Sequence, residues 1–474
     1  MNFIIIDISL AIIFAILLFL LVSKNKKNVK KEGWMYLYKT KVGLKIIDTL
    51  GKKYPRLWKY TSYLIVGLGY VLMGLMLYLL FSMIKLFLNS SFVQLVKIPP
   101  LMPIFPYFSD IFNVSWLPSF YFTYWIIAIA IVAIVHEASH GILARFYNVK
   151  IKSTGFGILG PFLAFFVEQD DKQMKKAKIF PQLSILAAGV FANILFGIIF
   201  FFLMFGFFHA TYTPGGIYFN DYSYNILNYS NLQEANFSNE KIQIYGTNFT
   251  KIIVDNKAYW LANNFLDSEL KENTEIKVYY DMPAVRAGLS GAITKINNIT
   301  ISTPEEYDIV IGNFKPGDRV IVTTSIERKT GIIESKDYEI TLDSSPINNT
   351  KPIMGIVRFS YIQTGFKGIM ARISTSFKDP MTFYSPKFNP PITKFFYDLL
   401  WWIVLINLSL ALTNMLPVGI FDGGRFFMLT VLAITGNKKI AEKSFKIATK
   451  FILALFVLLM VLWFIGIARG WFGF

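Results

Sequence analysis

Long apolar segments recur along the chain, separated by polar stretches, and six of them are long enough to cross a lipid bilayer. The pattern predicts helical spans at about residues 3–22, 61–88, 121–146, 183–208, 397–435 and 447–468. The fifth segment is interrupted near Pro417 and Gly419, two residue types that end helices. The predicted fold class is therefore an α-helical polytopic membrane protein.

A polar insertion, residues 209–396, separates the fourth and fifth spans. Its runs of β-branched and aromatic residues, such as Lys277–Tyr280 and Arg319–Thr324, predict a soluble β-rich domain. Within it, residues 273–346 resemble a PDZ domain of the protease-associated type. We expect a short helix after Pro283, a hairpin that turns at Asn297–Asn298, and an open strand edge able to accept a peptide.

The net charge of +17 is concentrated next to the predicted spans, with twelve Lys and Arg between Lys24 and Lys59. This arrangement favours membrane topology and contact with the lipid bilayer, and it excludes nucleic-acid binding as the reason for the charge. Because basic loops stay in the cytoplasm, we expect residues 23–60, 147–182 and 436–446 to be cytoplasmic and residues 89–120 and 209–396 to be extracytoplasmic.

A His-Glu-x-x-His motif, His136 to His140, lies inside the third predicted span. On a helix this spacing puts both imidazoles on one face, one turn apart, where they can share a metal ion. Glu137 between them is then positioned to carry protons for an attacking water molecule. Such polar side chains are costly within a bilayer unless they serve a site, so the motif predicts a zinc hydrolase with an intramembrane active site.

Two histidines do not complete a zinc site, and the chain has no cysteine to contribute. The remaining imidazole, His209, lies at the outer end of the fourth predicted span, whereas the histidine motif lies toward the inner end of the third. Asp422 follows the break in the fifth span, at about the depth of the histidine motif, and is the predicted third ligand. The alternative is that Asp422 only caps the second half of the broken helix.

Two intramembrane asparagines are further candidates, for contact with the substrate or with the oxyanion. Asn414 lies shortly before Asp422. Asn193 lies in the motif Gly189–Gly197, in which small residues at i and i+8 allow close approach of another helix and leave the amide on the same face. Packing between helices is the alternative for both asparagines.

The predicted cytoplasmic stretch between the third and fourth spans contains an apolar segment rich in glycine and aromatic residues, Gly155–Val167. It is too short and too broken for a spanning helix. We expect strands or a re-entrant segment packed against the helices, able to hold an unwound substrate strand by edge pairing.

Three ordered motifs, HEASH, GVFANILFG and NMLPVGIFDG, together with the PDZ-like insertion, resemble the site-2 protease family of intramembrane metalloproteases. The resemblance covers roughly residues 121–474. It implies one zinc ion held by His136, His140 and Asp422, with Glu137 as the catalytic base. It also implies cleavage of single-span membrane proteins in regulated intramembrane proteolysis.

The resemblance divides the chain into four parts. The first two spans carry none of the motifs, and we expect them to be peripheral. The parts are residues 1–120 with two spans and a basic loop, 121–208 with the first half of the protease core, 209–396 with the insertion, and 397–474 with the Asp-Gly span and the last span.

Two other functions fit parts of the pattern. A catalytically silent membrane scaffold would bind partners through the PDZ-like domain. A proton-coupled transporter would use His136, Glu137 and Asp422 as a proton relay. Bound zinc together with peptide cleavage would distinguish the protease from both.

Overall fold

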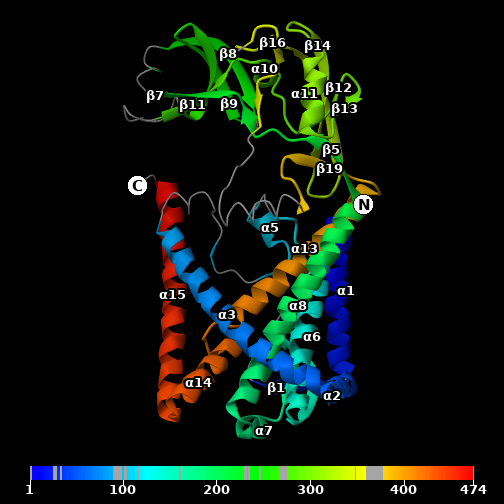
Figure 1. Ribbon diagram of the computed structural model, residues 1–474, viewed down its shortest axis with the longest axis vertical. Coiled ribbons are helices and arrows are strands. Elements are labelled where there is room, and N and C mark those ends of the chain that lie inside the picture. The colour runs from blue at the N-terminus through cyan, green and yellow to red at the C-terminus, as the bar shows by residue number, and fades with distance from the viewer. Residues whose placement is uncertain are drawn as a thin grey trace. The chain divides into compact units, whose positions relative to one another are not determined.

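Six helices in the described part of the chain are long and apolar enough to cross a membrane, in agreement with the six predicted spans (Figure 1). They are α1 (Phe3–Lys24), α3 (Pro55–Phe87), α6 (Phe122–Phe146), α8 (Ile179–Thr211), α13 (Pro390–Thr413) and α15 (Lys438–Phe472). The computed structural model describes residues 3–24, 29–32, 35–88, 99–100, 104–112, 114, 117–159, 162–228, 232, 235–244, 247–265, 275–346, 348–358 and 377–472.

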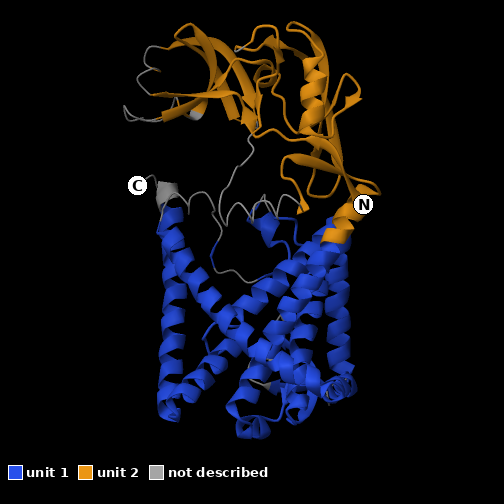
Figure 2. Ribbon diagram, in the orientation of Figure 1, with its two compact units in different colours: residues 1–204, 397–474 blue, residues 205–396 orange. Residues whose placement is uncertain are grey.

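The chain forms two compact units (Figure 2). Unit 1 consists of residues 1–204 and 397–474 and contains most of the apolar helices. Unit 2, residues 205–396, is the predicted insertion extended by residues 205–208. The boundaries between the units fall within α8 and near the start of α13.

The main apolar core of unit 1 is built from several helices, including α3. Ile65 and Leu72 of α3 are buried in it with Leu143 of α6 and Phe426 of α14 (Asp422–Thr435). A Cβ on Gly69 of α3 would lie 3.1 Å from the ring of Phe426, so the two helices are in close contact. The expectation that the first two spans are peripheral is therefore wrong for the second span. Apolar side chains at helical spacing gave no sign of which neighbour they would meet.

The first span is also tied to the histidine-motif helix, through Asp7. This side chain is fully buried, and its carboxylate accepts the backbone N–H groups of Phe122 at 2.7 Å and Thr123 at 2.9 Å. The hydroxyl of Tyr107, just before α5 (Phe108–Ile111), also donates to Asp7, at 2.5 Å. The first N–H groups of a helix lack partners within the helix, so α1 supplies the N-terminal cap of α6.

The segments before α3 and after α6 combine in one four-stranded antiparallel sheet. Its strands, in spatial order, are β1 (Val29–Glu32), β2 (Met35–Thr40), β3 (Ile151–Leu159) and β4 (Phe162–Gln169). The segment Gly155–Val167 was predicted to form either strands or a re-entrant segment, and it forms strands. Residues 160–161 of this segment lie outside the described residues. β4 is an edge strand of this sheet.

Glu168 near the end of β4 joins the two hairpins of the sheet. Ser153 Oγ donates to its carboxylate at 2.5 Å, and Lys39 Nζ donates at 3.0 Å. These two donors, with that of Ser153 the stronger, hold the pKa of Glu168 below its ordinary value. After β4 the chain continues in α7 (Asp171–Lys176), which Asp170 caps by accepting two backbone N–H groups.

The basic segment predicted as a loop also contains an amphipathic helix, α2 (Leu44–Lys53). This helix packs on α6: Ile47 is buried, and a Cβ on Gly51 would lie only 2.7 Å from the carbonyl oxygen of Ile142. Asp48 forms an ion pair with Arg145 of α6. The helical interval between apolar residues in this segment was the missed signal.

The fifth predicted span is interrupted as expected. Helix α13 ends at Thr413, residues 414–421 form turns, and α14 begins at Asp422. A hydrogen bond of 2.7 Å from Gly423 N to the carbonyl of Asn414 closes the interruption. Gly436, with a φ of 63°, ends α14 before α15.

Unit 2 contains two larger sheets and two apolar cores; the larger core contains residues of both sheets, such as Trp260 and Ile293. The five-stranded sheet has the order β7 (Tyr224–Asn228), β11 (Glu275–Tyr280), β10 (Lys257–Ala262), β9 (Thr247–Val254) and β8 (Asn236–Ile244). The six-stranded sheet has the order β15 (Ile333–Thr341), β14 (Arg319–Glu327), β12 (Ala292–Ile296), β5 (Tyr212–Ile217) and β19 (Thr382–Pro386), with β13 (Ile299–Thr300) beside β12.

Shorter elements complete unit 2. They are α10 (Pro283–Arg286), α11 (Pro304–Gly312), the 3-10 helix η2 (Asn263–Phe265), and the paired strands β16 (Asp343–Ser344) with β17 (Pro352–Ile353) and β18 (Ile356–Val357) with β6 (Asp221–Tyr222).

Two of the local predictions for residues 273–346, the short helix and the turn, are confirmed. Helix α10 begins at Pro283, and the turn between β12 and β13 has positive φ at Asn297 (46°) and Asn298 (66°). Asparagine tolerates this left-handed conformation better than most residues. The sheet also includes β5 and β19, which lie outside the predicted range, and β19 and β15 form its two edges.

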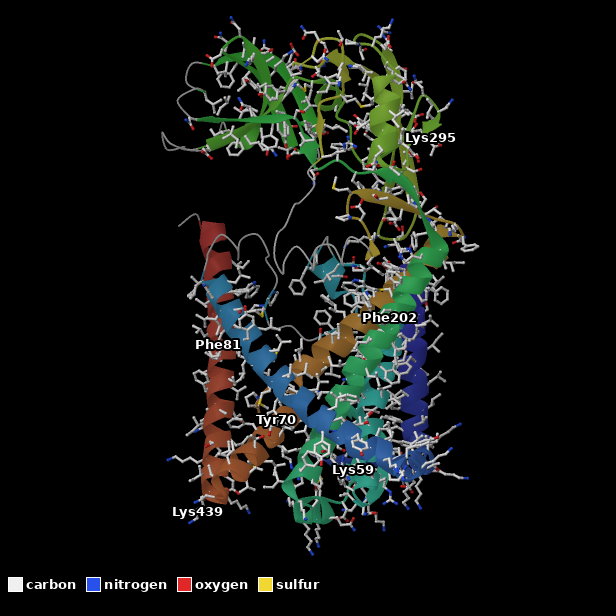
Figure 3. All side chains as sticks on the ribbon, viewed as in Figure 1. Lys59, Tyr70, Phe81, Phe202, Lys295 and Lys439 are labelled. Atoms are coloured by element: carbon white, nitrogen blue, oxygen red, sulfur yellow. The ribbon has the colours of Figure 1, made fainter. Side chains whose placement is uncertain are left out.

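The surface of the helices in unit 1 is apolar along their length and basic at one end (Figure 3). Tyr70, Phe81 and Phe202 are 42%, 50% and 64% exposed on α3 and α8. Lys59 and Lys439 lie at the same end of the bundle in Figure 3. Exposed aromatic side chains flanked by basic residues are typical of helices that span a bilayer.

Candidate metal centre

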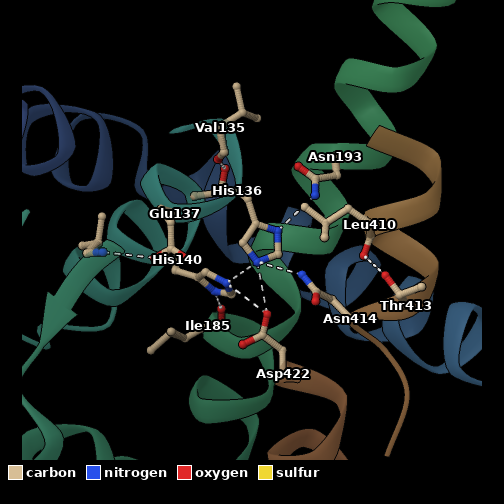
Figure 4. A network of polar contacts seen from close by, with 12 residues as sticks. Val135, His136, Glu137, His140, Ile185, Asn193, Leu410, Thr413, Asn414 and Asp422 are labelled. Carbon is tan, nitrogen blue, oxygen red and sulfur yellow. Dashed lines mark hydrogen bonds and ion pairs between the residues drawn. The ribbon is translucent and has the colours of Figure 1, made fainter. Parts of the chain in front are cut away.

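The two histidines of the motif lie on α6 with their rings directed to the same point (Figure 4). His136 and His140 are 5% and 6% exposed, and their Nε2 atoms are 3.1 Å apart. Helical spacing brings the rings together, because residues four apart lie on one face. The sequence prediction that the two imidazoles share one face of a helix is confirmed.

Asp422 completes the group from the first turn of α14. Its Oδ2 lies 3.2 Å from Nε2 of His136 and 3.3 Å from Nε2 of His140. Asp422 does not cap α14: the N-cap position is occupied by Phe421, and no side-chain capping bond forms there. The structure therefore brings the three predicted ligands together, although they are up to 286 positions apart in the sequence.

The three donor atoms fit a zinc ion. A tetrahedral zinc with bonds of about 2.0–2.1 Å to nitrogen and oxygen places neighbouring donors about 3.3–3.4 Å apart. The triangle formed by the two Nε2 atoms and Oδ2 has edges of 3.1, 3.2 and 3.3 Å. Two imidazoles and one carboxylate are also a common ligand set of catalytic zinc, which leaves a position open for water or substrate.

The two glycines after Asp422 determine its position. A Cβ on Gly423 would lie 2.3 Å from the carbonyl carbon of Met415, and one on Gly424 would lie 2.3 Å from the carbonyl oxygen of Val418. Only glycine fits such close contacts with backbone atoms. The Asp-Gly-Gly sequence thus allows α14 to start directly against the preceding turns.

Helix α8 lies against the other side of the two imidazoles. A Cβ on Gly189 would lie 2.6 Å from Cε1 of His136 and 2.6 Å from Nε2 of His140. The carbonyl oxygen of Ile185 accepts a hydrogen bond of 2.6 Å from Nδ1 of His140. Asn193 is fully buried, with Nδ2 3.1 Å from Nδ1 of His136. The close approach predicted for Gly189 is thus to the imidazoles themselves.

Glu137 faces strand β4. Its Oε2 accepts the backbone N–H of Val167 at 3.0 Å. A carboxylate oxygen of Glu137 also lies within 4.8 Å of a ring nitrogen of His136 and of His140. Asp422 is the carboxylate in hydrogen-bonding range of both imidazoles, whereas Glu137 lies beside them with a partner of its own.

A cavity of about 340 Å³ opens beside the triangle. Asn414 lies at this cavity, with Nδ2 3.4 Å from Nε2 of His136, whereas Asn193 does not line it. The lining residues are Ala133, His136, Glu137, Ala164, Phe165, Leu410, Asn414, Ile420, Phe421 and Asp422. The cavity therefore brings two of the candidate ligands, His136 and Asp422, to one space with Glu137 and the edge strand β4.

Two parts of the site were not predicted from the sequence. The contact of Val167 with Glu137 and that of Ile185 with His140 both use backbone groups, which every residue has. No residue type could therefore have marked them. The spacing from Ile185 to Gly189 and Asn193, one helical turn each, is the only signal the sequence contains.

The chain matches the family model described as peptidase family M50 over residues 124–459, a range that contains all of the proposed ligands. A curated relative, an uncharacterized protein of Methanocaldococcus jannaschii, is 31% identical over 188 residues, which are 39% of this chain and 47% of the relative. The match thus spans about half the length of that relative. With the family model covering most of its length, and with the three ordered motifs, the chain belongs to peptidase family M50, a family of zinc metalloproteases.

Proposed function

We propose that the chain is an intramembrane zinc metalloprotease that hydrolyses peptide bonds in or near the membrane spans of other proteins. The observation that carries this proposal is the triangle of His136, His140 and Asp422: the two histidines are buried on α6, a helix of membrane-spanning length, and the half-buried Asp422 begins α14. A carboxylate and two imidazoles within a bilayer are costly unless they serve a site. Their separations of 3.1, 3.2 and 3.3 Å are close to the spacing of donors around a tetrahedral zinc ion.

His136, His140 and Asp422 would hold the zinc ion. When bound, zinc supplies a Lewis acid that polarises a peptide carbonyl and makes water more acidic. Glu137, beside the ligands, accepts the proton of the attacking water and delivers it to the leaving amine. Asn414 lines the same cavity and is placed to donate from Nδ2 to the carbonyl oxygen of the substrate.

Strand β4 offers an edge on which an unwound substrate segment can pair. The N–H of Val167 points away from β3, because it donates to Glu137. Backbone groups alternate in direction along a strand, so those of Phe165, two residues earlier, point to the same open side. Phe165 and Ala164 line the cavity. A substrate strand paired there would pass directly beside Glu137.

Two further features of the proposal concern unit 2 and topology. We propose that the basic end of the bundle is cytoplasmic and that unit 2 is an extracytoplasmic PDZ-like domain. The short helix at Pro283 and the Asn297–Asn298 turn support the PDZ-like assignment. Of two roles, we favour a gate that admits single-span proteins with shortened outer domains, in regulated intramembrane proteolysis, over a docking site for a peptide.

The gate and the docking site predict different results with the full-length chain. A gate slows cleavage as the outer domain of a single-span substrate grows, whatever its sequence. A docking site makes cleavage depend on the sequence of the outer segment at constant size. Cleavage that ignores both properties would exclude both roles.

Activity itself is tested with Glu137→Gln. The variant should keep its zinc and lose cleavage of a single-span substrate, because the glutamine amide cannot carry the proton. Neither a scaffold nor a transporter predicts peptide cleavage by the unmodified chain. Full cleavage by the Glu137→Gln variant would overturn the proposed mechanism.

A further inference from the structure

Helix α8 presents three residues to the histidine rings at intervals of one turn. Ile185, Gly189 and Asn193 are at positions i, i+4 and i+8, so they lie on one face of the helix. Ile185 meets Nδ1 of His140, Asn193 meets Nδ1 of His136, and Gly189 leaves room for both rings. Ile185 and Asn193 therefore contact the ring nitrogens opposite to those in the triangle.

The contact with Ile185 determines which nitrogen of His140 can bind a metal. A backbone carbonyl can only accept a hydrogen bond, so Nδ1 of His140 must carry the proton. In a neutral imidazole Nε2 is then unprotonated, and this is the atom that points into the triangle. A neutral His140 therefore has the tautomer that can ligate zinc through Nε2.

His136 has the same requirement and a different neighbour. Its Nε2 lies in the triangle, so metal binding needs a proton on Nδ1 and an acceptor facing it. The group facing Nδ1 is the amide of Asn193, of which only Oδ1 can accept. With Nδ2 facing the ring, as in the structure, Nδ1 is the acceptor and the proton lies on Nε2.

Rotation of the Asn193 amide by half a turn exchanges its oxygen and nitrogen in place. Oδ1 of Asn193 is buried and has no hydrogen-bond partner among the described residues, so the rotation breaks no other bond of that atom. The two amide orientations therefore select two forms of His136, one with Nε2 protonated and one with Nε2 free to bind a metal.

We propose that Asn193 is a positioning residue for the metal: its Oδ1 accepts the Nδ1 proton of His136 in the zinc-loaded protein and so fixes His136 as an Nε2 ligand. The inference rests on the proposed function, because it assumes zinc in the triangle. It separates two asparagines for which the sequence predicts the same two roles. Asn414 lines the cavity and can reach a substrate, whereas Asn193 lies behind the ring and outside the lining.

The test measures zinc affinity of the full-length protein by competition with a chelator of known affinity. Asn193→Leu keeps the size of the side chain and removes the acceptor, so it should weaken zinc binding by roughly 10–100-fold, the usual effect of losing such a partner. Asn193→Asp keeps an acceptor and should bind zinc within a few-fold of the unmodified chain.

Asn407→Leu is the matched control. Asn407 is also fully buried on a helix, and its Oδ1 also lacks a partner among the described residues, but its Nδ2 donates to the carbonyl of Ile403 at 2.8 Å and the residue does not touch the triangle. This variant should keep the zinc affinity of the unmodified chain. A loss equal to that of Asn193→Leu would show that burying leucine at such a position is itself the cause, and would overturn the assignment.

A second measurement reads the imidazole directly. The chain has only three histidines, so nitrogen NMR of isotope-labelled histidine in the full-length protein can follow each ring. The zinc-loaded protein should show His136 protonated at Nδ1, and Asn193→Leu should shift this signal while that of His209 stays in place.

The outcomes separate this inference from the proposed function. An unmodified chain that binds no zinc contradicts the proposed function itself. Normal zinc affinity and an unchanged His136 signal in Asn193→Leu overturn the positioning role while leaving the proposed function intact. If that variant also loses turnover, Asn193 acts on the substrate.

Discussion

The backbone N–H of Val167 donates to Oε2 of Glu137 across 3.0 Å, joining the edge strand β4 to the histidine-motif helix α6. The proposed base is thus oriented by the strand on which we expect the substrate to pair. A substrate strand that pairs with β4 would therefore lie against a carboxylate that is already in place.

Removing this hydrogen bond should slow the reaction without releasing the metal. Proline has no backbone N–H, so Val167→Pro removes the donor to Glu137. Because the N–H of Val167 points away from β3, the pairing between β3 and β4 should survive. We expect the turnover number to fall by roughly tenfold to a hundredfold, which is less than the about 10²–10⁴-fold of full general base catalysis because Glu137 itself is kept.

Zinc content should stay unchanged in Val167→Pro, and Val167→Ala, which keeps the N–H, serves as the control. Steady-state cleavage of a single-span substrate and metal analysis measure both quantities. Equal rates in the proline and alanine variants would show that the contact with Glu137 does not matter for turnover.

Gly189 should be required for zinc binding. The added Cβ of Gly189→Ala would lie 2.6 Å from atoms of both imidazoles, so at least one ring must move out of the triangle. The loss of zinc affinity should exceed the roughly 10–100-fold that removal of one outer hydrogen-bond partner causes.

Gly206→Ala on the same helix is the control, because a Cβ at that position would meet no atom of the described residues within 4 Å. Alanine favours a helix over glycine by about 1 kcal/mol, so this variant should be at least as stable as the unmodified chain. A metal titration measures the zinc affinity of both variants. If Gly189→Ala retains its zinc affinity, the rings of His136 and His140 lie farther from α8 than the structure places them.

The start of α14 should depend on Gly424 in the same way. A Cβ there would lie 2.3 Å from the carbonyl oxygen of Val418, so Gly424→Ala must displace the turns that position Asp422. We expect lower thermal stability and loss of most zinc.

Gly419 lies in the same interruption, but the added Cβ of Gly419→Ala would contact, among the described residues, only the ring of Phe445, at 3.4 Å, so zinc and stability should be kept. Thermal unfolding with metal analysis compares the two variants. Equal behaviour would contradict the role given to the close contact at Gly424.

Much of the fold and of the site could be predicted because the decisive residues are rare in their surroundings. Histidine, glutamate and aspartate within apolar segments mark a site, since each is costly there. His136, His140 and Asp422 could be grouped from the sequence alone, using helical rise and the break at Pro417. The turn at Asn297–Asn298 followed from residue types that accept positive φ.

What could not be predicted depends on backbone groups and on which neighbour a side chain meets. The carbonyl of Ile185 and the N–H of Val167 leave no trace in the sequence. The basic segment before α3 was predicted as a loop because its many lysines are typical of loops between spans, but it forms the strands β1 and β2 and the helix α2. Asp7 in the first span was the one acidic residue there, and its role as the cap of α6 depends on a contact 115 positions away.

The zinc content of the purified full-length protein tests the central claim most directly. We predict about one zinc per chain, and loss of most of it in Asp422→Asn, because Oδ2 of Asp422 lies 3.2 and 3.3 Å from the two Nε2 atoms. Asp398→Asn, another buried acid, on α13, should keep its zinc. An unmodified chain without zinc, or an Asp422→Asn variant with full zinc, would contradict the account.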